Sequence, residues 1–235
     1  MRFENTKVHG IDTAIRSMRM PFQSFDKGDS YWDSIYNDYV DTDGAFKIGT
    51  SDMDLIHRLL TASSDGNGAH SKFLRSIHVY TEITAPLYFL QELDTYKIGT
   101  VRNSSSLQHI GAKRDYVPND FELDQSHLYS GVGLSDSERD LRTILEIVNK
   151  WREKYKETND YSYFRIMRQL MPMGYDYTIS WTANYDVLRT IYIQRIKSPH
   201  RLKEWTVNFA NWLSCLPYAS NLITYGLDGK KDVRE

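Results

Sequence analysis

Two segments of this sequence alternate apolar with polar residues, and a helical pattern follows each of them directly. Residues 77–83 (IHVYTEI) have the period of two that is typical of a half-buried strand, and residues 177–181 (YTISW) repeat it. A helix is expected from the Thr84-Ala85-Pro86 junction, because threonine caps helices and proline suits the first turn. Another helix is expected from Asn184 to about Ile196. Strands mixed irregularly with helices predict an α+β sheet-and-helix fold.

The remaining helices are expected where apolar residues recur every three or four positions. Ser135 and Glu138 match a capping box before the longest such pattern, and Ser51 is a plausible cap of another. Residues 1 to about 50 show little periodicity and predict a loop-rich segment, while 226–235 predict a mobile charged tail. We therefore expect one α+β domain over residues 1–225. The further helices are expected from Ser51 to before Ser63, across Leu141–Tyr155, across Phe164–Leu170 and across Leu202–Leu213.

Charge and composition exclude several classes of function. The net charge of −2 and the pI near 6.4 give no cationic field, so we expect no binding to nucleic acid. No apolar run approaches the roughly 20 residues of a membrane span, and the N-terminus lacks the apolar core of a signal peptide. With Cys215 as the one cysteine and the histidines scattered, we expect a cytoplasmic protein without a metal site.

One arginine lies at the end of an apolar helical stripe, a position where a core-facing helix normally has no charged residue. Asn184, Leu188, Ile191 and Arg195 are spaced by four, three and four residues, which puts the first and last about 20° apart on an α-helix. A guanidinium at the end of an apolar stripe needs its donors satisfied. A structural ion pair or solvent exposure would explain this arginine, and so would a ligand.

Several motifs follow one another in the C-terminal half. They are Arg168-Gln-Leu-Met-Pro172, Trp181-Thr-Ala-Asn184, the residues Leu188, Ile191 and Arg195, and Ser198-Pro-His200 through Glu204. In this order they resemble the flavin-dependent thymidylate synthases, and the resemblance covers roughly residues 70 to 215. The segments from Met18 to Ser30 and from Asp94 to Lys97 are similar to a divergent branch of that family that occurs in bacterial viruses.

The resemblance implies roles for the motif residues. Arg168 takes the place of an arginine that reaches the substrate phosphate from a neighbouring subunit, and Asn184 takes the place of an asparagine that opens a helix. Arg195 takes the place of the arginine that holds and polarises the uracil ring of dUMP. Guanidinium donors match both phosphate and carbonyl oxygens, which agrees with these roles. The resemblance also implies a homotetramer with its sites between subunits.

The flavin-binding signature of the family aligns on Ala85-Pro86 and is altered here. Thr95 and Leu107 stand at two of its arginine positions, whereas Lys97 keeps a positive charge at a third. Residues 103–106 are either a flexible linker or a phosphate-binding loop. By this alignment the cofactor-binding residues are Thr95, Tyr96, Lys97, Thr100 and His200, and the substrate-binding residues besides Arg168, Asn184 and Arg195 are Glu92, Asn103, Ser105 and Ser106.

Two functions therefore stay open from the sequence. The first is an enzyme that transfers a methyl or one-carbon group to C5 of a uridine nucleotide, either dUMP or a modified pyrimidine. The resemblance implies reduced FAD as hydride donor, with methylenetetrahydrofolate and NADPH, and Arg195 as the catalytic residue. The second is a catalytically inactive homologue that binds or senses a pyrimidine nucleotide and has lost flavin chemistry.

Overall fold

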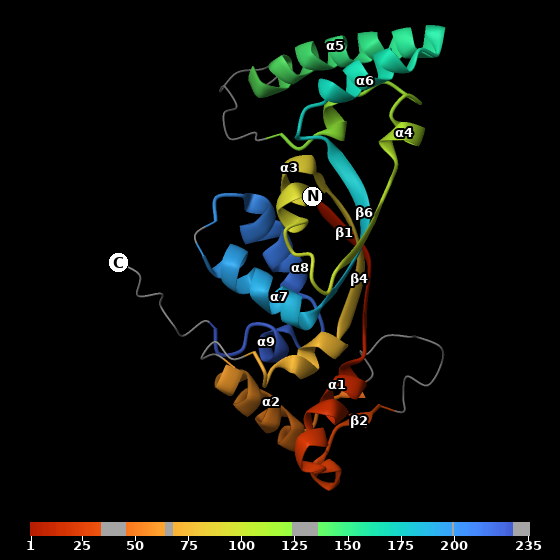
Figure 1. The fold of residues 1–235 in the computed structure, drawn as a ribbon. Coiled ribbons are helices and arrows are strands. Elements are labelled where there is room, and N and C mark those ends of the chain that lie inside the picture. Colours follow the sequence, from red (N-terminus) through yellow and green to blue (C-terminus); the bar gives the residue numbers. More distant parts are fainter. Residues whose placement is uncertain (34–45, 64–67, 124–135, 199, 228–235) are drawn as a thin grey trace. The chain divides into compact units, whose positions relative to one another are not determined.

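The computed structural model mixes helices with a four-stranded sheet (Figure 1). The strands are β1 (Arg2–His9), β2 (Tyr31–Trp32), β3 (Phe46–Lys47), β4 (His78–Pro86), β5 (Val101–Ser104) and β6 (Asp176–Asn184). The larger sheet has the order β1-β4-β6-β5, and β2 pairs antiparallel with β3. The α+β fold class and both strands predicted from the alternating segments are confirmed. The structure describes residues 1–33, 46–63, 68–123, 136–198 and 200–227.

Contacts within the chain separate two compact units. The division falls within all four strands of the larger sheet. The expectation of one domain over residues 1–225 stays a prediction. Unit one comprises Met1–Arg2, Ile83–Thr95 and Asn103–Ile179, and unit two comprises Phe3–Glu82, Tyr96–Arg102 and Ser180–Glu235.

Unit one has its core between its two longest helices. They are α5 (Asp136–Thr158) and α6 (Tyr161–Gln169), which lie side by side (Figure 1). Both confirm helices expected from apolar periodicity, although the expected cap Ser135 lies outside the described residues. The other helices of this unit are α3 (Leu87–Leu93) and α4 (Leu107–Ile110), with a 3-10 turn at Pro118–Asp120. The core residues are Tyr116, Phe121, Leu141, Leu145, Val148, Phe164 and Met167.

Unit two contains five α-helices, among its described residues, around a second core. Its largest fully buried side chains include Trp205, Tyr185 and Phe209. The 3-10 turns are Met20–Phe22, Phe25–Lys27 and Lys72–Ser76, and two π-helical segments span Tyr192–Lys197 and Glu204–Phe209. The α-helices are α1 (Ile11–Met18), α2 (Thr50–Ser63), α7 (Tyr185–Ile191), α8 (Ala210–Ser214) and α9 (Ala219–Leu222).

The N-terminal segment differs from its prediction. Residues 1–33 and 46–50 are not loop-rich, because β1 and α1 occupy most of the first eighteen residues. In α1 the buried residues Ile11, Ala14, Ile15 and Met18 have the spacing of a helical stripe, so this helix was visible in the sequence. β1 was not, because most of its side chains are exposed and polar.

The strand-to-helix junction at Thr84 also differs in detail. β4 continues to Pro86, and α3 begins at Leu87 without a side-chain cap. Thr84 is therefore not a cap, and its hydroxyl lies 2.9 Å from that of Thr178 in unit one. Near the C-terminus, α9 was not expected at all.

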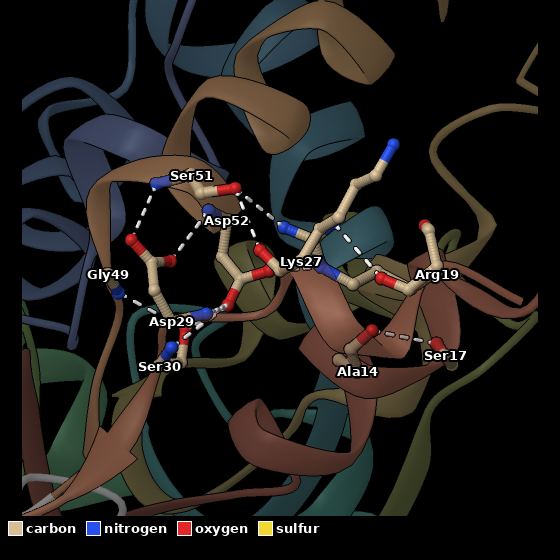
Figure 2. Close-up of polar contacts among 10 residues, drawn as sticks. Ala14, Ser17, Arg19, Lys27, Asp29, Ser30, Gly49, Ser51 and Asp52 are labelled. Carbon is tan, nitrogen blue, oxygen red and sulfur yellow. Dashed lines mark hydrogen bonds and ion pairs between the residues drawn. The ribbon is translucent and has the colours of Figure 1, made fainter.

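Asp52 of α2 is a buried carboxylate that holds the preceding segment in place. Only 1% of its surface is exposed, and its ion-pair partner Arg19 is 5% exposed. Arg19 Nε donates to Asp52 Oδ1 at 2.6 Å (Figure 2). The amides of Asp29 and Ser30 and the Ser30 hydroxyl donate to Oδ2. Burying a charge is costly unless it is paired and hydrogen-bonded, and here both oxygens are satisfied.

The first turn of α2 is capped by a residue far from it in sequence. The Asp29 carboxylate accepts hydrogen bonds from the amides of Ser51 and Asp52 at 2.8 and 3.1 Å (Figure 2). The hydrogen bond from the Ser51 amide is the main cause that holds the pKa of Asp29 below its usual value. The expectation of Ser51 as the cap is wrong, since this residue lies inside the helix and its hydroxyl donates to the Lys27 carbonyl.

Removing the Asp52 carboxylate should destabilise the protein strongly. Asp52→Ala leaves the Arg19 guanidinium buried without its counter-charge, and we expect a loss of about 3–5 kcal/mol in the free energy of unfolding. Asp54→Ala changes an exposed aspartate of the same helix and should shift it by less than about 0.5 kcal/mol. Urea denaturation measures both. Equal losses from the two variants would contradict a central role for the Arg19–Asp52 pair.

At the start of β6, Asp176 is a half-buried carboxyl group in unit one. Burial raises its pKa to about 6, and the nearby N-terminal ammonium group opposes this shift. Its Oδ1 atom has no hydrogen-bond partner among the described residues. The pKa in the folded state therefore exceeds the value of about 3.9 in an unfolded chain. The ionised group disfavours folding above about pH 6, and this penalty vanishes below about pH 4.

Asp176→Asn should therefore stabilise the protein in a pH-dependent way. We expect a gain of roughly 1 kcal/mol at pH 7, after allowing for partial solvent exposure, and no gain below about pH 4. Denaturation curves of both proteins between pH 4 and pH 7 measure the difference. A gain that is the same at both ends of this range would show that the titration of Asp176 is not its source.

Candidate functional site

Arg195 lies at the centre of a compact polar and aromatic cluster in unit two. Its Nε donates to the Tyr96 hydroxyl at 3.1 Å, and its Nη1 lies 3.0 Å from His200 Nε2. The guanidinium carbon is 5.7 Å from the centre of the Trp205 ring and 6.0 Å from that of Tyr96, within cation–π range. The Tyr96 hydroxyl also donates to Gln194 Oε1. We call Tyr96, Arg195, His200 and Trp205 the Arg195 cluster.

The cluster depends on two π-helical segments that pack against each other. Arg195 lies in Tyr192–Lys197 and Trp205 in Glu204–Phe209. A π-helix bonds residue i to i+5, so the angle per residue of an α-helix does not apply to Arg195. The argument that Asn184 and Arg195 share one face of an α-helix is therefore wrong. Single π turns inside α-helices occur frequently at functional sites, which makes this departure informative.

Asn184 has a structural role at the start of α7. Its side-chain oxygen accepts a hydrogen bond from the Val187 amide at 3.0 Å, so it is the N-cap, as its place before the helix implies. Its Nδ2 faces Gly99, where a Cβ atom would come within 2.6 Å. Gly99 has φ +79°, which also favours glycine. This close approach links α7 to the segment that carries Tyr96.

The other cofactor-binding residues expected in unit two lie on that same segment. The Thr100 hydroxyl donates to the Tyr96 carbonyl, which closes the turn. Lys97 is exposed, and its neighbour Ile98 is 91% exposed. The structure thus brings Tyr96 and His200 to Arg195, and it places Thr100 and Lys97 in the turn that follows Tyr96.

Arg168 belongs to unit one, where it lies in the last turn of α6. Its side chain is exposed and forms no hydrogen bond or ion pair with the described residues. Its positive charge acts on Tyr116, whose pKa is raised mainly by burial and is lowered in small part by Arg168. Arg114, by contrast, is paired with Asp120 in the same unit.

The remaining expected residues lie in unit one, where Thr95 and Ser105 form hydrogen bonds within that unit. The Thr95 hydroxyl donates to the Glu92 carbonyl at 2.7 Å, at the end of α3. The amide and hydroxyl of Ser105 both donate to the Thr178 carbonyl, at 3.1 and 3.0 Å. Asn103 is exposed in β5, and Ser106 precedes α4 without capping it through its side chain. Their assignment to substrate or cofactor stays a prediction.

The Arg195 cluster has the groups that hold a flat, polar ring. A guanidinium offers paired donors in one plane, which match carbonyl oxygens, and the half-buried Tyr96 ring can stack on a ligand. The Trp205 ring is fully buried, so it packs against the guanidinium and not against a ligand. Trp205 was expected only as a core residue of the last helix, and Gln194 was not singled out. The approach of Tyr96 to Gln194 is a tertiary contact that periodicity does not reveal.

Two other kinds of site find no support in the part of the chain that the structure describes. No group of three or more histidine, cysteine, aspartate or glutamate side chains there could hold a metal ion. Among the same residues, no helix has the length and apolar character that crossing a membrane requires.

Changing Asn184 tests its role as the N-cap of α7. Asn184→Ala removes the acceptor for the Val187 amide and should cost about 1 kcal/mol of stability. Asn184→Asp keeps an acceptor and should cost only a few tenths of that value. Thermal and urea denaturation measure both. If the alanine variant is as stable as the unmodified protein, the cap contributes nothing.

The fold is similar to solved enzymes, although no protein-family model and no curated protein matches the sequence. Thymidylate synthase X (ThyX) from Helicobacter pylori with FAD and dUMP gives a TM-score of 0.63 at 20% identity, over 95% of this chain and 97% of that one. The UMP/dUMP methylase PolB from Streptomyces cacaoi, bound with 5-Br dUMP, gives 0.61 at 15% identity, over 95% and 94%. At such low identity the likeness concerns the fold. This chain has the mixed helix-and-sheet fold of the ThyX-type flavin-dependent thymidylate synthases.

Proposed function

We propose that this chain binds a pyrimidine nucleotide of the uridine class, dUMP or a modified pyrimidine, at the Arg195 cluster. The observation that carries the proposal is the position of the Arg195 guanidinium, held by Tyr96 and His200 beside the Trp205 ring. A guanidinium fixed in this way is preorganised to donate to the carbonyl oxygens of a uracil ring. The solved structures of similar fold contain dUMP or 5-Br dUMP, which supports the same ligand class.

Arg168 would supply the contact to the nucleotide phosphate. Its exposed guanidinium forms no ion pair with the described residues, so binding a phosphate breaks no existing interaction there. In the family that the sequence resembles, this arginine reaches the site from a neighbouring subunit. The proposal therefore includes a homotetramer, in which Arg168 of one subunit serves the Arg195 cluster of another.

The first candidate reaction is transfer of a methyl or one-carbon group to C5 of the base. Methylenetetrahydrofolate would supply the carbon, and bound FAD, reduced with NADPH, would supply the hydride. Arg195 would stabilise the negative charge that develops on the ring as C5 becomes nucleophilic.

The chain fits the flavin phosphates poorly. At two positions where the family has arginine, the Leu107 side chain is buried and the Thr95 hydroxyl donates to the Glu92 carbonyl. Lys97 alone of the three keeps a positive charge, and it is exposed. Each missing arginine removes charge-assisted hydrogen bonds of about 1.5–3 kcal/mol. This misfit favours the second candidate, a protein that binds or senses a pyrimidine nucleotide without flavin chemistry.

Nucleotide binding should raise the melting temperature and depend on Arg195. With dUMP at about 100 times its dissociation constant we expect roughly 2.7 kcal/mol of stabilisation. Arg195→Gln should weaken binding by roughly 10- to 100-fold through the loss of charge-assisted hydrogen bonds. Arg201→Gln, an exposed neighbour, is the matched control and should bind as the unmodified protein does. If none of dUMP, UMP and dTMP raises the melting temperature, the proposal is wrong.

The absorbance spectrum of the purified protein separates the two candidates. A flavin spectrum, present on purification or after reconstitution with FAD, together with conversion of dUMP to dTMP when methylenetetrahydrofolate and NADPH are added, supports the transferase. A colourless protein that still shows the dUMP shift supports the nucleotide-binding homologue.

A further inference from the structure

A cavity lies within unit two between α1, residues 25–30, β3 and the start of α2. Its volume is about 270 Å³. Ile15, Phe25 and Phe46 give it apolar walls. The other lining residues are Gly28, Ser30 and the charged Asp12, Arg16, Arg19 and Asp52. None of its lining residues belongs to the Arg195 cluster. It lies close to the lower limit of about 300 Å³ for ligand pockets, so it suits a small molecule.

The Arg19–Asp52 pair forms a fixed wall of this cavity. Both oxygens of Asp52 already accept hydrogen bonds, so Asp52 has little capacity to bind a ligand. Arg19 also donates from Nη1 to the Ser24 carbonyl at 3.4 Å and from Nη2 to the Ser51 hydroxyl at 3.0 Å. A guanidinium has five N–H groups. Two N–H groups of this buried arginine thus have no acceptor among the described residues.

Asp12 and Arg16 of α1 also line the cavity, and they do not pair with each other. Their spacing of four residues would allow an ion pair on the helix surface. Instead, the Arg16 guanidinium stacks 4.5 Å above the centre of the Phe25 ring, and Asp12 Oδ1 accepts from the amide and hydroxyl of Thr13. The stacked guanidinium keeps its N–H groups, and Asp12 keeps its Oδ2, for a partner in the cavity.

These groups define the charge of a matching ligand. The charges of Arg19 and Asp52 cancel within their pair, which leaves one positive group, Arg16, and one negative group, Asp12. A monoanionic carboxylate matches the forked donors of Arg16 and the remaining donors of Arg19. A cationic amine matches Asp12. A phosphate dianion fits less well, because the Asp12 carboxylate would repel it.

We infer that this cavity binds a small zwitterion with an apolar body, namely a free amino acid with an apolar side chain. Its carboxylate is bound by Arg16 and Arg19, its ammonium group by Asp12, and its side chain by Ile15, Phe25 and Phe46. A Cβ atom at Gly28 would lie 3.3 Å from the Phe25 carbonyl oxygen, 3.6 Å from Arg19 Nε and 3.7 Å from Asp52 Oδ2, so a side chain there would lie against the Arg19–Asp52 wall. The Gly28 backbone is extended, with φ −73°, so a larger residue is allowed there.

Calorimetry and thermal shift with defined probes test this inference. We expect L-phenylalanine or L-leucine to bind and to raise the melting temperature. 3-Phenylpropionate lacks the amine, phenethylamine lacks the carboxylate, and phenyl phosphate carries a dianion; each should bind at least tenfold more weakly than L-phenylalanine. No binding of either amino acid overturns the inference. So does equal or tighter binding of 3-phenylpropionate or phenyl phosphate, which would indicate a simple anion site.

Variants locate the binding in the cavity. Arg16→Gln and Asp12→Asn should each weaken the binding of L-phenylalanine at least tenfold, and Gly28→Val should abolish it by filling the space. Arg58→Gln, an exposed arginine of α2 outside the cavity, is the matched control and should leave binding unchanged. Unchanged binding in both Arg16→Gln and Asp12→Asn contradicts the site. Because Arg16 is exposed and Asp12 is half-buried, neither substitution should unfold the protein, so weaker binding would report on the site itself.

The test is independent of the proposed nucleotide site. Arg195→Gln should leave the affinity for L-phenylalanine unchanged, and dUMP should not displace it. Displacement by dUMP, or loss of amino-acid binding in Arg195→Gln, would place the amino acid at the Arg195 cluster and overturn the inference.

Discussion

The buried carboxylate of Asp52 is the constraint on which the N-terminal part of unit two depends. An ionised group with 1% exposure must have its oxygens satisfied, and α2 alone cannot do this. Arg19, Asp29 and Ser30 supply the donors, so the chain from α1 to β2 folds back over the first turn of α2 (Figure 2). The same folding brings the Asp29 carboxylate to the start of α2 as its cap. The same folding also forms one wall of the cavity, because Arg19 and Asp52 line that cavity.

Regular periodicity predicted the fold better than capping signals did. β4, β6, α5 and α6 were all expected, because their buried faces repeat every two residues or every three to four. α1 has the same kind of stripe and could have been predicted. The cap of α2 could not, because Asp29 lies 22 residues before Ser51 and reaches it only in the folded chain. The polar strand β1 has no periodic pattern in the sequence. It forms because it pairs with β4 in the sheet, and not because one of its faces is buried.

The candidate site shows what a resemblance adds and what it leaves open. Tyr96, Arg195 and His200 were named from the resemblance, and the structure brings these three together. The helical geometry offered for Arg195 failed, because the π-helical turn Tyr192–Lys197 has no signature in apolar spacing. Asn184 has a local explanation as a helix cap, which requires no ligand. The cap gives Asn184 a structural role in this fold, and its assignment to the substrate stays a prediction.

The cavity and the Arg195 cluster share no residue, yet both belong to unit two, so coupling between them needs a physical link. The turn Lys72–Ser76 packs against both α1, which lines the cavity, and α7, which leads into the π-helical turn of Arg195. Arg75 of this turn pairs with Asp186 of α7 at 2.9 Å, and the Tyr185 amide donates to the Ile77 carbonyl just after the turn. A ligand that enters the preformed cavity without displacing α1 leaves this route unused, so the two sites should bind their ligands independently. The Arg75–Asp186 pair is exposed, so it contributes little to any coupling between the two sites.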